Sequence, residues 1–236
     1  MLLYHHPNLK GLEIWHGLAR RATLYQLRED KPTYFAALNE FLNDLHAGTA
    51  QTPVNTDLSI AAGFERLILT GGDAGDASPY ITRPHLVANP GPFAARPGAE
   101  ALWREYKWRN PVAIDLGQSR IKVLTESTSV AIERTNQPFL ELLRPLVPQK
   151  CGGAILALPV EIDSSGTAGP CSYPGLYGPL EPLFASLFPR QPWLAINDAL
   201  LAARGYPPPN GEKSLILTLG FGVGAALWIN PCQSTI

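Results

Sequence analysis

The chain has 236 residues, of which 45% are hydrophobic and 17% charged, and its formal net charge is −1 at pH 7. These values fit a soluble globular protein with one domain or two small lobes and a sizeable core. A nearly neutral chain lacks the basic face of a general nucleic-acid-binding protein, and no apolar run reaches the roughly 18 residues that a membrane span requires.

The cysteine pattern and the first residues indicate a compartment. Cys151, Cys171 and Cys232 are odd in number and widely spaced, without a Cys-x-x-Cys pair. We expect free thiols in a reducing environment, and a disulfide stays open as the alternative. The stretch MLLYHHPNLK lacks the charged start and the apolar segment of a signal peptide. The sequence therefore predicts a cytoplasmic protein.

Helices dominate the first part of the chain. Apolar residues recur at helical spacing over 11–30, and Pro32 fits the first turn of a second helix. A short apolar strand over 65–70 follows, and directly after it comes the pair Gly71-Gly72. A glycine pair after a buried strand allows a flat ligand to lie against the backbone, and a plain strand-to-helix turn explains the pair equally well.

The pattern becomes strand-rich from residue 111 onward, after a third predicted helix over 95–108. Three successive antiparallel strands are predicted over 112–115, 120–126 and 129–133. The first turn carries Asp115 and Gly117. A carboxylate at a strand end, followed by a glycine whose neighbouring N–H groups face outward, suits a hydrated Mg²⁺ ion and a phosphate. Taken alone, such a pair is more often a simple hairpin turn.

A strand-to-helix junction lies further along the chain. Predicted strands over 154–158 and 193–196 are separated by a long Gly/Pro/Ser-rich loop over 159–178 and a helix over 181–188. Asn197 or Asp198 would cap the helix that follows the second strand. The same position allows Asp198 to accept the proton of a substrate hydroxyl that attacks a phosphoryl group, with Asn197 orienting the sugar hydroxyls. Both interpretations stay open at this point.

The last predicted strands form a second glycine-rich hairpin. After a rigid linker over 206–211, the apolar run 214–218 leads into Gly220, Gly222 and Gly224. The spacing matches neither a P-loop nor the glycine motif of a dinucleotide fold. Two such hairpins in one chain can hold a triphosphate from both sides, which is a clamp of the actin and hexokinase type.

Several blocks resemble the ROK-type sugar kinases of the actin-like ATPase superfamily. VAIDLGQSRIKV and LILTLGFGVGAALW resemble the two phosphate hairpins of that family, and LPVEIDSSGTAGP followed by WLAINDALLAARG resembles its sugar loop and catalytic Asn-Asp helix. GLEIWHGLARRA resembles the segment with a sugar-contacting glutamate, ERLILTGGDAG the adenosine-binding Gly-Gly turn, and RPGAEALW the closing helix. The blocks are short, and together they cover most of the chain.

The order of these blocks differs from that of the family. There the first phosphate hairpin opens the chain, whereas here the segment around Glu13 and the Gly-Gly turn precede it. Circular permutation is the simplest account, with the old ends joined near 108–111 and new ends opened after Trp228. The resemblance implies an α/β protein with a circularly permuted, two-lobed actin-like ATPase (ribonuclease H-like) fold and a central cleft. The expected lobes are 97–204, and 1–96 together with 205–236.

The resemblance also implies a reaction and its residues. The expected function is ATP-dependent phosphorylation of a hydroxyl on a sugar or sugar-like small molecule, with ATP and Mg²⁺ as cofactors. Asp198 is the expected base, and the expected acceptor-binding residues are Asn197, Glu13 and His6. Phosphates and Mg²⁺, the latter through water at the carboxylate, are expected to be held by Asp115, Gly117, Ser119, Gly220, Gly222 and Gly224. Gly71 and Gly72 are expected to flank the adenosine.

Some features depart from the family. Phe221 stands where the second hairpin usually has a threonine, so a bulky ring replaces a hydroxyl that can bind phosphate. The cysteine-rich zinc segment is missing, and we expect no zinc-type metal site. The Glu-x-Gly-His element is reduced to the stretch near Tyr4-His5-His6, where a sugar-contacting histidine, a paired-histidine metal site and a simple surface pair are the alternatives.

These departures favour a rival function. A catalytically inactive sugar- or nucleotide-binding regulator or scaffold of the same fold is compatible with Phe221, whereas Asp115 and Asp198 favour the kinase. No helix-turn-helix is apparent, and we expect neither a nucleic-acid nor a membrane partner. A homodimer is one open assembly.

Overall fold

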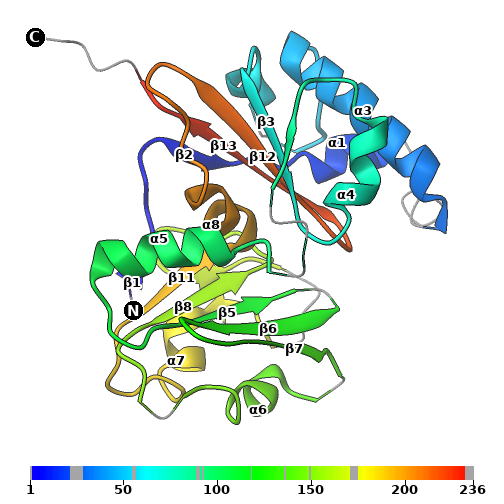
Figure 1. Ribbon diagram of the computed structural model, residues 1–236. Coiled ribbons are helices and arrows are strands. Elements are labelled where there is room, and N and C mark those ends of the chain that lie inside the picture. The colour runs from blue at the N-terminus through cyan, green and yellow to red at the C-terminus, as the bar shows by residue number, and fades with distance from the viewer. Residues whose placement is uncertain are drawn as a thin grey trace, which may run out of the picture. The chain divides into compact units, whose positions relative to one another are not determined.

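The structure, a computed structural model, describes residues 2–21, 29–54, 57–88, 91, 93–117, 119–135, 137–148, 150–170 and 175–231 (Figure 1). Cys171, Cys232 and the predicted helical residues 22–28 lie outside this part of the chain. The chain divides into two compact units. Unit 1 comprises Met1–His5 and Ala95–Gly205, and unit 2 comprises His6–Ala94 and Tyr206–Ile236.

Unit 1 is built on a six-stranded mixed sheet with the order β1-β11-β8-β5-β6-β7. Its strands are β1 (Leu2–Leu3), β5 (Val112–Leu116), β6 (Arg120–Thr125), β7 (Ser129–Glu133), β8 (Ala154–Leu158) and β11 (Trp193–Asn197). β5, β6 and β7 form an antiparallel meander, and β8, β11 and β1 extend it in parallel on the side of β5. β5 and β8 are buried at every residue, as expected for strands covered on both faces.

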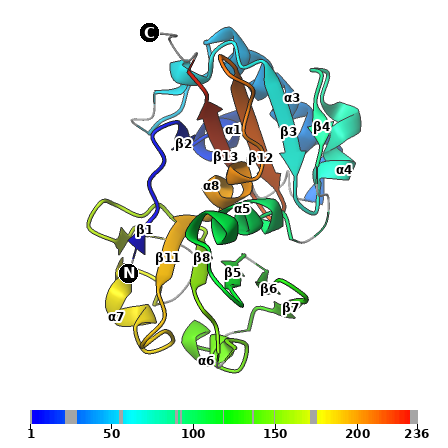
Figure 2. The same ribbon diagram turned by 60° about the vertical axis from the view of Figure 1, so that its left-hand side comes forward.

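Helices cover both faces of this sheet (Figures 1 and 2). α5 (Arg96–Tyr106) and α8 (Asp198–Arg204) lie on one face, while α6 (Phe139–Leu143) and α7 (Leu180–Phe184) lie on the other. α5 and α8 pack closely because Gly98 has no side chain; a Cβ atom there would overlap the carbonyl oxygen of Leu201. The small ribbon of β9 (Thr167–Ala168) and β10 (Gly178–Pro179) begins in the predicted 159–178 loop and ends just beyond it.

Unit 2 contains a five-stranded sheet with the order β2-β13-β12-β3-β4. Its strands are β2 (Leu9–Gly11), β3 (Arg66–Thr70), β4 (Leu86–Val87), β12 (Lys213–Leu219) and β13 (Val223–Ile229). β12, β13 and β2 form an antiparallel meander, and β3 and β4 extend it in parallel on the side of β12. The helical segments are α1 (Trp15–Arg21), α3 (Lys31–Ala47), η1 (Leu58–Ala61), α4 (Ala74–Ala77) and η2 (Ser78–Tyr80).

The longest helix, α3, begins and ends where its sequence predicts. The side chain of Asp30 accepts a hydrogen bond from the Thr33 amide at 3.2 Å, and Pro32 lies in the first turn. Gly48 ends the helix in the left-handed region with φ of 75°. The buried face of α3 packs on one face of the unit 2 sheet, which places the core of this unit between them.

Most predicted elements are confirmed, and β1 and β2, each at one edge of its sheet, are exceptions. The three-stranded meander from residue 112 and the strand over 154–158 are present. The prediction missed β1 and β2, because two- and three-residue strands carry almost no periodic signal. β1 pairs with β11 in unit 1, and α1 begins only at Trp15 since Leu9–Gly11 pairs with β13.

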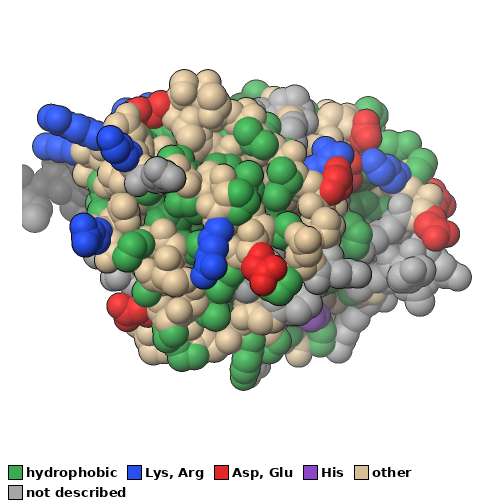
Figure 3. Space-filling model, turned by 90° about the horizontal axis from the view of Figure 1, so that it is seen from below, with side chains coloured by type: hydrophobic (Ala, Val, Ile, Leu, Met, Phe, Trp, Pro, Cys, Tyr) green, Lys and Arg blue, Asp and Glu red, His purple; other side chains and the backbone are tan. Residues whose placement is uncertain are grey.

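Figure 3 shows one face on which acidic and basic groups lie among hydrophobic and other side chains. Among the helices of the described residues, none has the length and apolar character needed to cross a membrane.

Candidate functional site

Three parallel strands of unit 1 end at the same edge of their sheet. β8 pairs in parallel with both β5 and β11, so their carboxyl ends point the same way. Asp115 lies near this end of β5, and Asn197 and Asp198 lie where β11 passes into α8. Ligands of open α/β sheets bind outside the carboxyl ends of the strands. The structure thus brings together the two aspartates that the sequence singles out.

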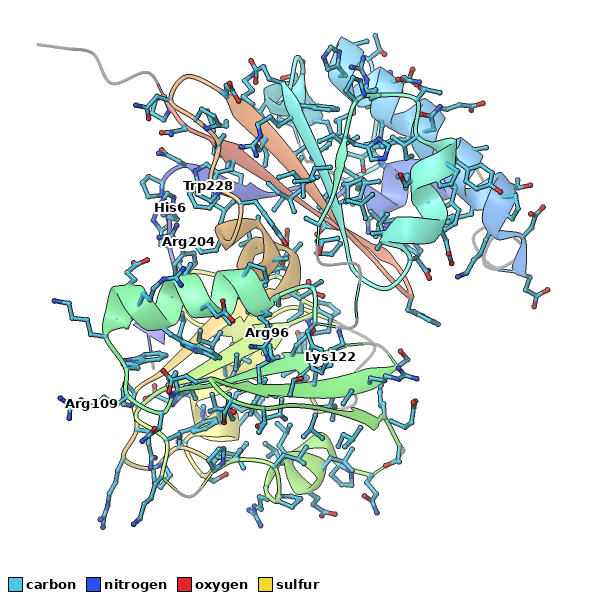
Figure 4. The ribbon with its side chains drawn as sticks, viewed as in Figure 1. His6, Arg96, Arg109, Lys122, Arg204 and Trp228 are labelled. Carbon is cyan, nitrogen blue, oxygen red and sulfur yellow. The ribbon has the colours of Figure 1, made fainter. Side chains whose placement is uncertain are left out.

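Asp115 forms an ion pair inside this edge. The register of β5 and β6 places Lys122 directly opposite Asp115, and the lysine Nζ donates to the aspartate Oδ2 at 2.7 Å. The side chains of Asp115 and Lys122 are only 9% and 18% exposed. Such a pair interacts more strongly than a solvated one, because little water screens it. Figure 4 labels Lys122 on β6.

Asp198 is a carboxyl group with a strongly raised pKa. Burial, followed by the nearby negative charge of Asp115, raises its pKa from 3.8 to about 7. Two contacts lower the pKa of Asp198 but do not offset this rise. The Ala199 amide donates to Asp198 Oδ1 at 2.7 Å, and the positive charge of Lys122 acts in the same direction. A carboxyl group whose pKa is raised toward neutrality suits a general acid or base.

Asn197 has the capping role that the sequence left open. Its side-chain oxygen accepts hydrogen bonds from the amides of Ala199 at 3.0 Å and Leu200 at 3.3 Å, and its Nδ2 donates to the carbonyl of Val160 at 3.3 Å. The carboxamide ties α8 to the chain that follows β8. Because Asn197 caps the helix, Asp198 keeps a carboxylate oxygen that the cap does not need.

The turn between β5 and β6 carries Gly117 and Ser119. A Cβ atom at Gly117 would lie 2.8 Å from the carbonyl oxygen of Arg120 and 3.4 Å from Lys122 Nζ, so the turn closes only with glycine there. The carbonyl of Ser119 accepts from the Arg134 amide at 2.9 Å, and the residue is exposed. Gly117 thus lies beside the Asp115–Lys122 pair, and the Ser119 backbone is hydrogen-bonded to the chain that follows β7.

Unit 2 gathers its predicted residues at the corresponding edge of its own sheet. β3 and β12 are parallel, and beyond their ends the Asp73 amide donates to the carbonyl of Leu219 at 3.1 Å. Gly71 is buried with φ of 98°, and a Cβ atom there would overlap the Leu219 carbonyl oxygen. Gly72 is exposed and has free space at the Cβ position. Packing therefore requires Gly71, whereas Gly72 leaves backbone accessible.

The β12–β13 turn lies at this same edge. Gly220 donates to the carbonyl of Gly222 at 3.1 Å and has free space at its Cβ position, while Phe221 between them is 52% exposed. Gly224 pairs with Thr218 at the start of β13. The aromatic ring of Phe221 thus does not fill the interior of unit 2.

The β2–α1 segment brings Glu13 to this turn, but His6 lies elsewhere. The Leu12 amide donates to the Ala225 carbonyl at 2.9 Å, and the ring of Trp15 lies 3.8 Å from the Cβ position of Gly222. His6 instead packs on Trp228, with ring centroids 5.0 Å apart, at the far end of β13 (Figure 4). Its Nδ1 accepts from the Asn8 amide at 3.3 Å. Within unit 2, the structure does not join His6 to the other predicted residues.

Lys122 was not predicted as a site residue, although the length of the hairpin indicates that it lies opposite Asp115. Asp115 and Lys122 are equally distant from the centre of the β5–β6 turn, so the cross-strand register could have been counted from the sequence. Lys31 was also missed. Its Nζ lies 2.9 Å from Asp73 Oδ1 and 3.3 Å from Asp76 Oδ2, beside the Gly71-Gly72 turn.

The residues at Asp115 do not fit a site in which the carboxylate itself ligates Mg²⁺. Mg²⁺ needs several oxygen ligands in near-octahedral geometry. One oxygen of Asp115 already accepts from Lys122, and the ammonium occupies the space next to it. Among the described residues, no group of three or more His, Cys, Asp or Glu side chains is arranged to hold a metal ion.

No family model and no curated protein sequence matches the chain. Among solved structures, a ROK family protein from Streptococcus pneumoniae TIGR4 in complex with sucrose is similar in part. The two chains are 22% identical with a TM-score of 0.41, and the match covers 52% of this chain and 46% of that chain. The matched part thus spans about half the length of each protein.

Proposed function

We propose that the chain is an ATP-dependent kinase that phosphorylates a hydroxyl group of a sugar or sugar-like small molecule. The observation that carries the proposal is the position of Asp198: a carboxyl group with a pKa of about 7 at the carboxyl edge of a parallel sheet, beside the Asp115–Lys122 pair. Perturbed carboxyl groups at such edges are typical of catalytic sites.

Asp198 acts as the general base in this reaction. Its ionised carboxylate accepts the proton of the acceptor hydroxyl while the oxygen forms a bond to the γ-phosphorus of ATP. The bond between that phosphorus and the bridging oxygen breaks, and ADP leaves with the electron pair. The nearby carboxylate of Asp115 raises the proton affinity of Asp198, and Lys122 keeps the pair from carrying two uncompensated negative charges.

The phosphates are assigned to backbone turns. In unit 1, we assign the phosphoryl group to the turn with Gly117 and Ser119. In unit 2, we assign the phosphates to Gly220, Gly222 and Gly224. We assign the adenosine to the Gly71-Gly72 turn. Glu13 and Asn197 are assigned to the acceptor. Mg²⁺ bound to ATP would neutralise charge on the phosphates, while Asp115 stays paired with Lys122.

The order of the elements supports a circularly permuted member of the ROK-type fold. In each unit a three-stranded meander is extended by parallel strands, which is the arrangement that a ribonuclease H-like fold implies. In unit 2, β2 belongs to the meander of β12 and β13 although it comes first in sequence, and the Ile229 amide donates to the Asn8 carbonyl at 2.8 Å. α5 connects directly to β5 through Lys107 and Asn110, both in the left-handed region.

A rearranged chain tests the permutation. It starts at residue 111 and joins residue 231 to residue 2 through a flexible Gly/Ser linker, which restores the block order of the family. We expect a cooperative unfolding transition and the same nucleotide affinity as the parent chain. A rearranged chain without a cooperative transition contradicts the permutation and leaves the kinase proposal to the next experiment.

The kinase proposal is tested by ADP release from Mg-ATP with a panel of sugars. We expect turnover with at least one sugar, and we expect Asp198→Asn to lower kcat by about 10²- to 10⁴-fold while ATP still binds. Glu133→Gln is the matched control, because it removes an exposed carboxylate of unit 1 that pairs only at the surface. Equal turnover in Asp198→Asn and the parent chain would falsify the assignment of the base.

One observation favours a second candidate, a nucleotide- or sugar-binding regulator without catalysis. Phe221 is 52% exposed between two glycines of the proposed phosphate turn, where it offers a ring and no hydroxyl. The regulator predicts a thermal shift with ATP and no ADP release with any sugar. The kinase predicts both, so the two functions are separated by the same panel.

A further inference from the structure

The Asp115–Lys122 pair is fixed by the backbone of unit 1. The two residues face each other across the antiparallel pair of β5 and β6, at the end of β5 and near the start of β6. Cross-strand neighbours lie close on the same face of a sheet, so the lysine needs no unusual rotamer to reach the carboxylate. The ion pair is thus a built-in feature of the hairpin.

The ammonium group lies at the turn and is shielded from water. Lys122 Nζ is 2.7 Å from Asp115 Oδ2 and 3.4 Å from the Cβ position of Gly117, and the lysine side chain is 18% exposed. It also lies close enough to Asp198 for its charge to oppose the rise of that carboxyl group's pKa. A positive charge therefore already sits between the strand end and the turn.

A divalent ion at Asp115 would have to displace this charge. A metal ion and an ammonium group repel each other strongly at low exposure, and Asp115 can offer only the oxygen that Lys122 leaves. A lysine is a compact point charge with three donors, and it can neutralise a carboxylate without oxygen ligands of its own.

We propose that Lys122 is the resident cation of this site: its ammonium group takes the place that a divalent ion would occupy at Asp115 and so excludes metal binding there. The inference goes beyond the proposed function and does not depend on it, since metal binding is measured without nucleotide. For a kinase, it means that Mg²⁺ reaches the site only on ATP.

The experiment measures Mn²⁺ binding to the full chain without nucleotide, by electron paramagnetic resonance and by isothermal titration. In the parent chain, we expect no Mn²⁺ binding that depends on Asp115, so Asp115→Asn should leave the measured binding unchanged. We expect Lys122→Met to bind Mn²⁺ at least roughly tenfold more tightly than the parent chain. In the double variant Lys122→Met/Asp115→Asn, we expect this gain to disappear.

Arg120→Met is the matched control. It removes one positive charge from the same strand, but Arg120 pairs with Glu133 at the surface, where the side chains are 51% and 70% exposed. We expect no gain of Mn²⁺ binding from this change. An equal gain in Arg120→Met would reduce the effect to net charge and overturn the proposal.

Two further results would also overturn it. One is a Mn²⁺ site in the parent chain that Asp115→Asn abolishes, and the other is a folded Lys122→Met chain without any gain. If Lys122→Met does not fold, Lys122→Gln replaces it, since its amide still donates to Asp115 without a charge. Loss of kinase activity in any variant leaves these readings unchanged, so failure of the proposed function is recognised separately.

Discussion

The two units share a strand plan and differ in the chemistry at its edge. In unit 1 the meander β5-β6-β7 is extended by β8 and β11, and in unit 2 the meander β12-β13-β2 is extended by β3 and β4. At the carboxyl edge of unit 1 lie the buried pair Asp115–Lys122 and Asp198. At the corresponding edge of unit 2 lie glycine turns, and the ion pair beside them, formed by Lys31, is exposed.

The fold thus provides the same location in both units, the carboxyl edge of the sheet, whereas the side chains at that edge determine the chemistry. A buried charge pair interacts strongly with other charged groups nearby, because little water screens it. A glycine turn offers only N–H and C=O groups, which suit a ligand that needs close approach of the backbone. Four sets of variants test this contrast, and they are ordered by the size of the effect that we expect.

The largest effect is expected from removing the lysine of each edge. Lys122→Met leaves Asp115 buried without its partner, which costs about 3–5 kcal/mol of unfolding free energy. Lys31→Met breaks a pair in which the lysine is 49% exposed, and this costs less than about 1 kcal/mol. Urea unfolding at pH 7.5 measures both. Similar losses for the two variants would show that the unit 1 pair is no more shielded than the unit 2 pair.

Asp198→Asn is expected to stabilise the chain, in a manner that depends on pH. The pKa of Asp198 is raised from 3.8 to about 7, so the folded protein binds a proton that the unfolded chain releases. The stability that this proton contributes is present below about pH 4 and is lost as the pH rises to 7. At pH 8 the variant should gain up to about 4 kcal/mol over the parent chain, since the shift is about three pKa units.

Denaturant unfolding of both chains between pH 4 and 8 measures this difference. We expect it to be small at pH 4, because Asp198 is protonated there in the folded state and close to half protonated in the unfolded chain. A difference that stays constant over this range contradicts the raised pKa. Together with the loss of turnover expected for the same variant, a gain in stability would mark Asp198 as a residue kept for function.

The glycines of the two turns are expected to respond differently to alanine. Gly117→Ala brings a methyl group to 2.8 Å from the Arg120 carbonyl oxygen and should cost about 1–3 kcal/mol. Gly220→Ala meets no atom within 4 Å and should change stability by less than about 0.5 kcal/mol. For a kinase, Gly220→Ala should weaken ATP binding all the same. Thermal unfolding and nucleotide titration separate the two effects.

The smallest effect is expected in the core of unit 2. The hydroxyl of Ser214 is fully buried and has no hydrogen-bond partner among the described residues. Ser214→Ala removes this cost and should stabilise the chain by about 1 kcal/mol. Ser129→Ala, at an exposed position of β7, is the control and should change little. Destabilisation by Ser214→Ala would mean that the hydroxyl does have a partner, such as an ordered water.

The sequence predicted elements with a strong periodic pattern and missed those without one. The buried runs of β5 and β8 and the amphipathic α3 were recognised because their apolar residues repeat over several positions. β1 and β2 are too short for a repeat, and their pairing partners lie far away in the chain. Such strands form only because an existing edge offers unpaired backbone groups.

The residue types and the predicted turns indicate where a reaction is plausible. Asp115 and Asp198 each lie at the end of an apolar run, and Gly71 follows another such run. Tertiary structure alone decided that the two aspartates share one edge and that Gly71 is required for packing against Leu219. It also placed Lys122 beside Asp115 under the Gly117 turn. The physical reason is that periodicity is a local property, whereas burial and charge pairing depend on strands that meet only in the folded sheet.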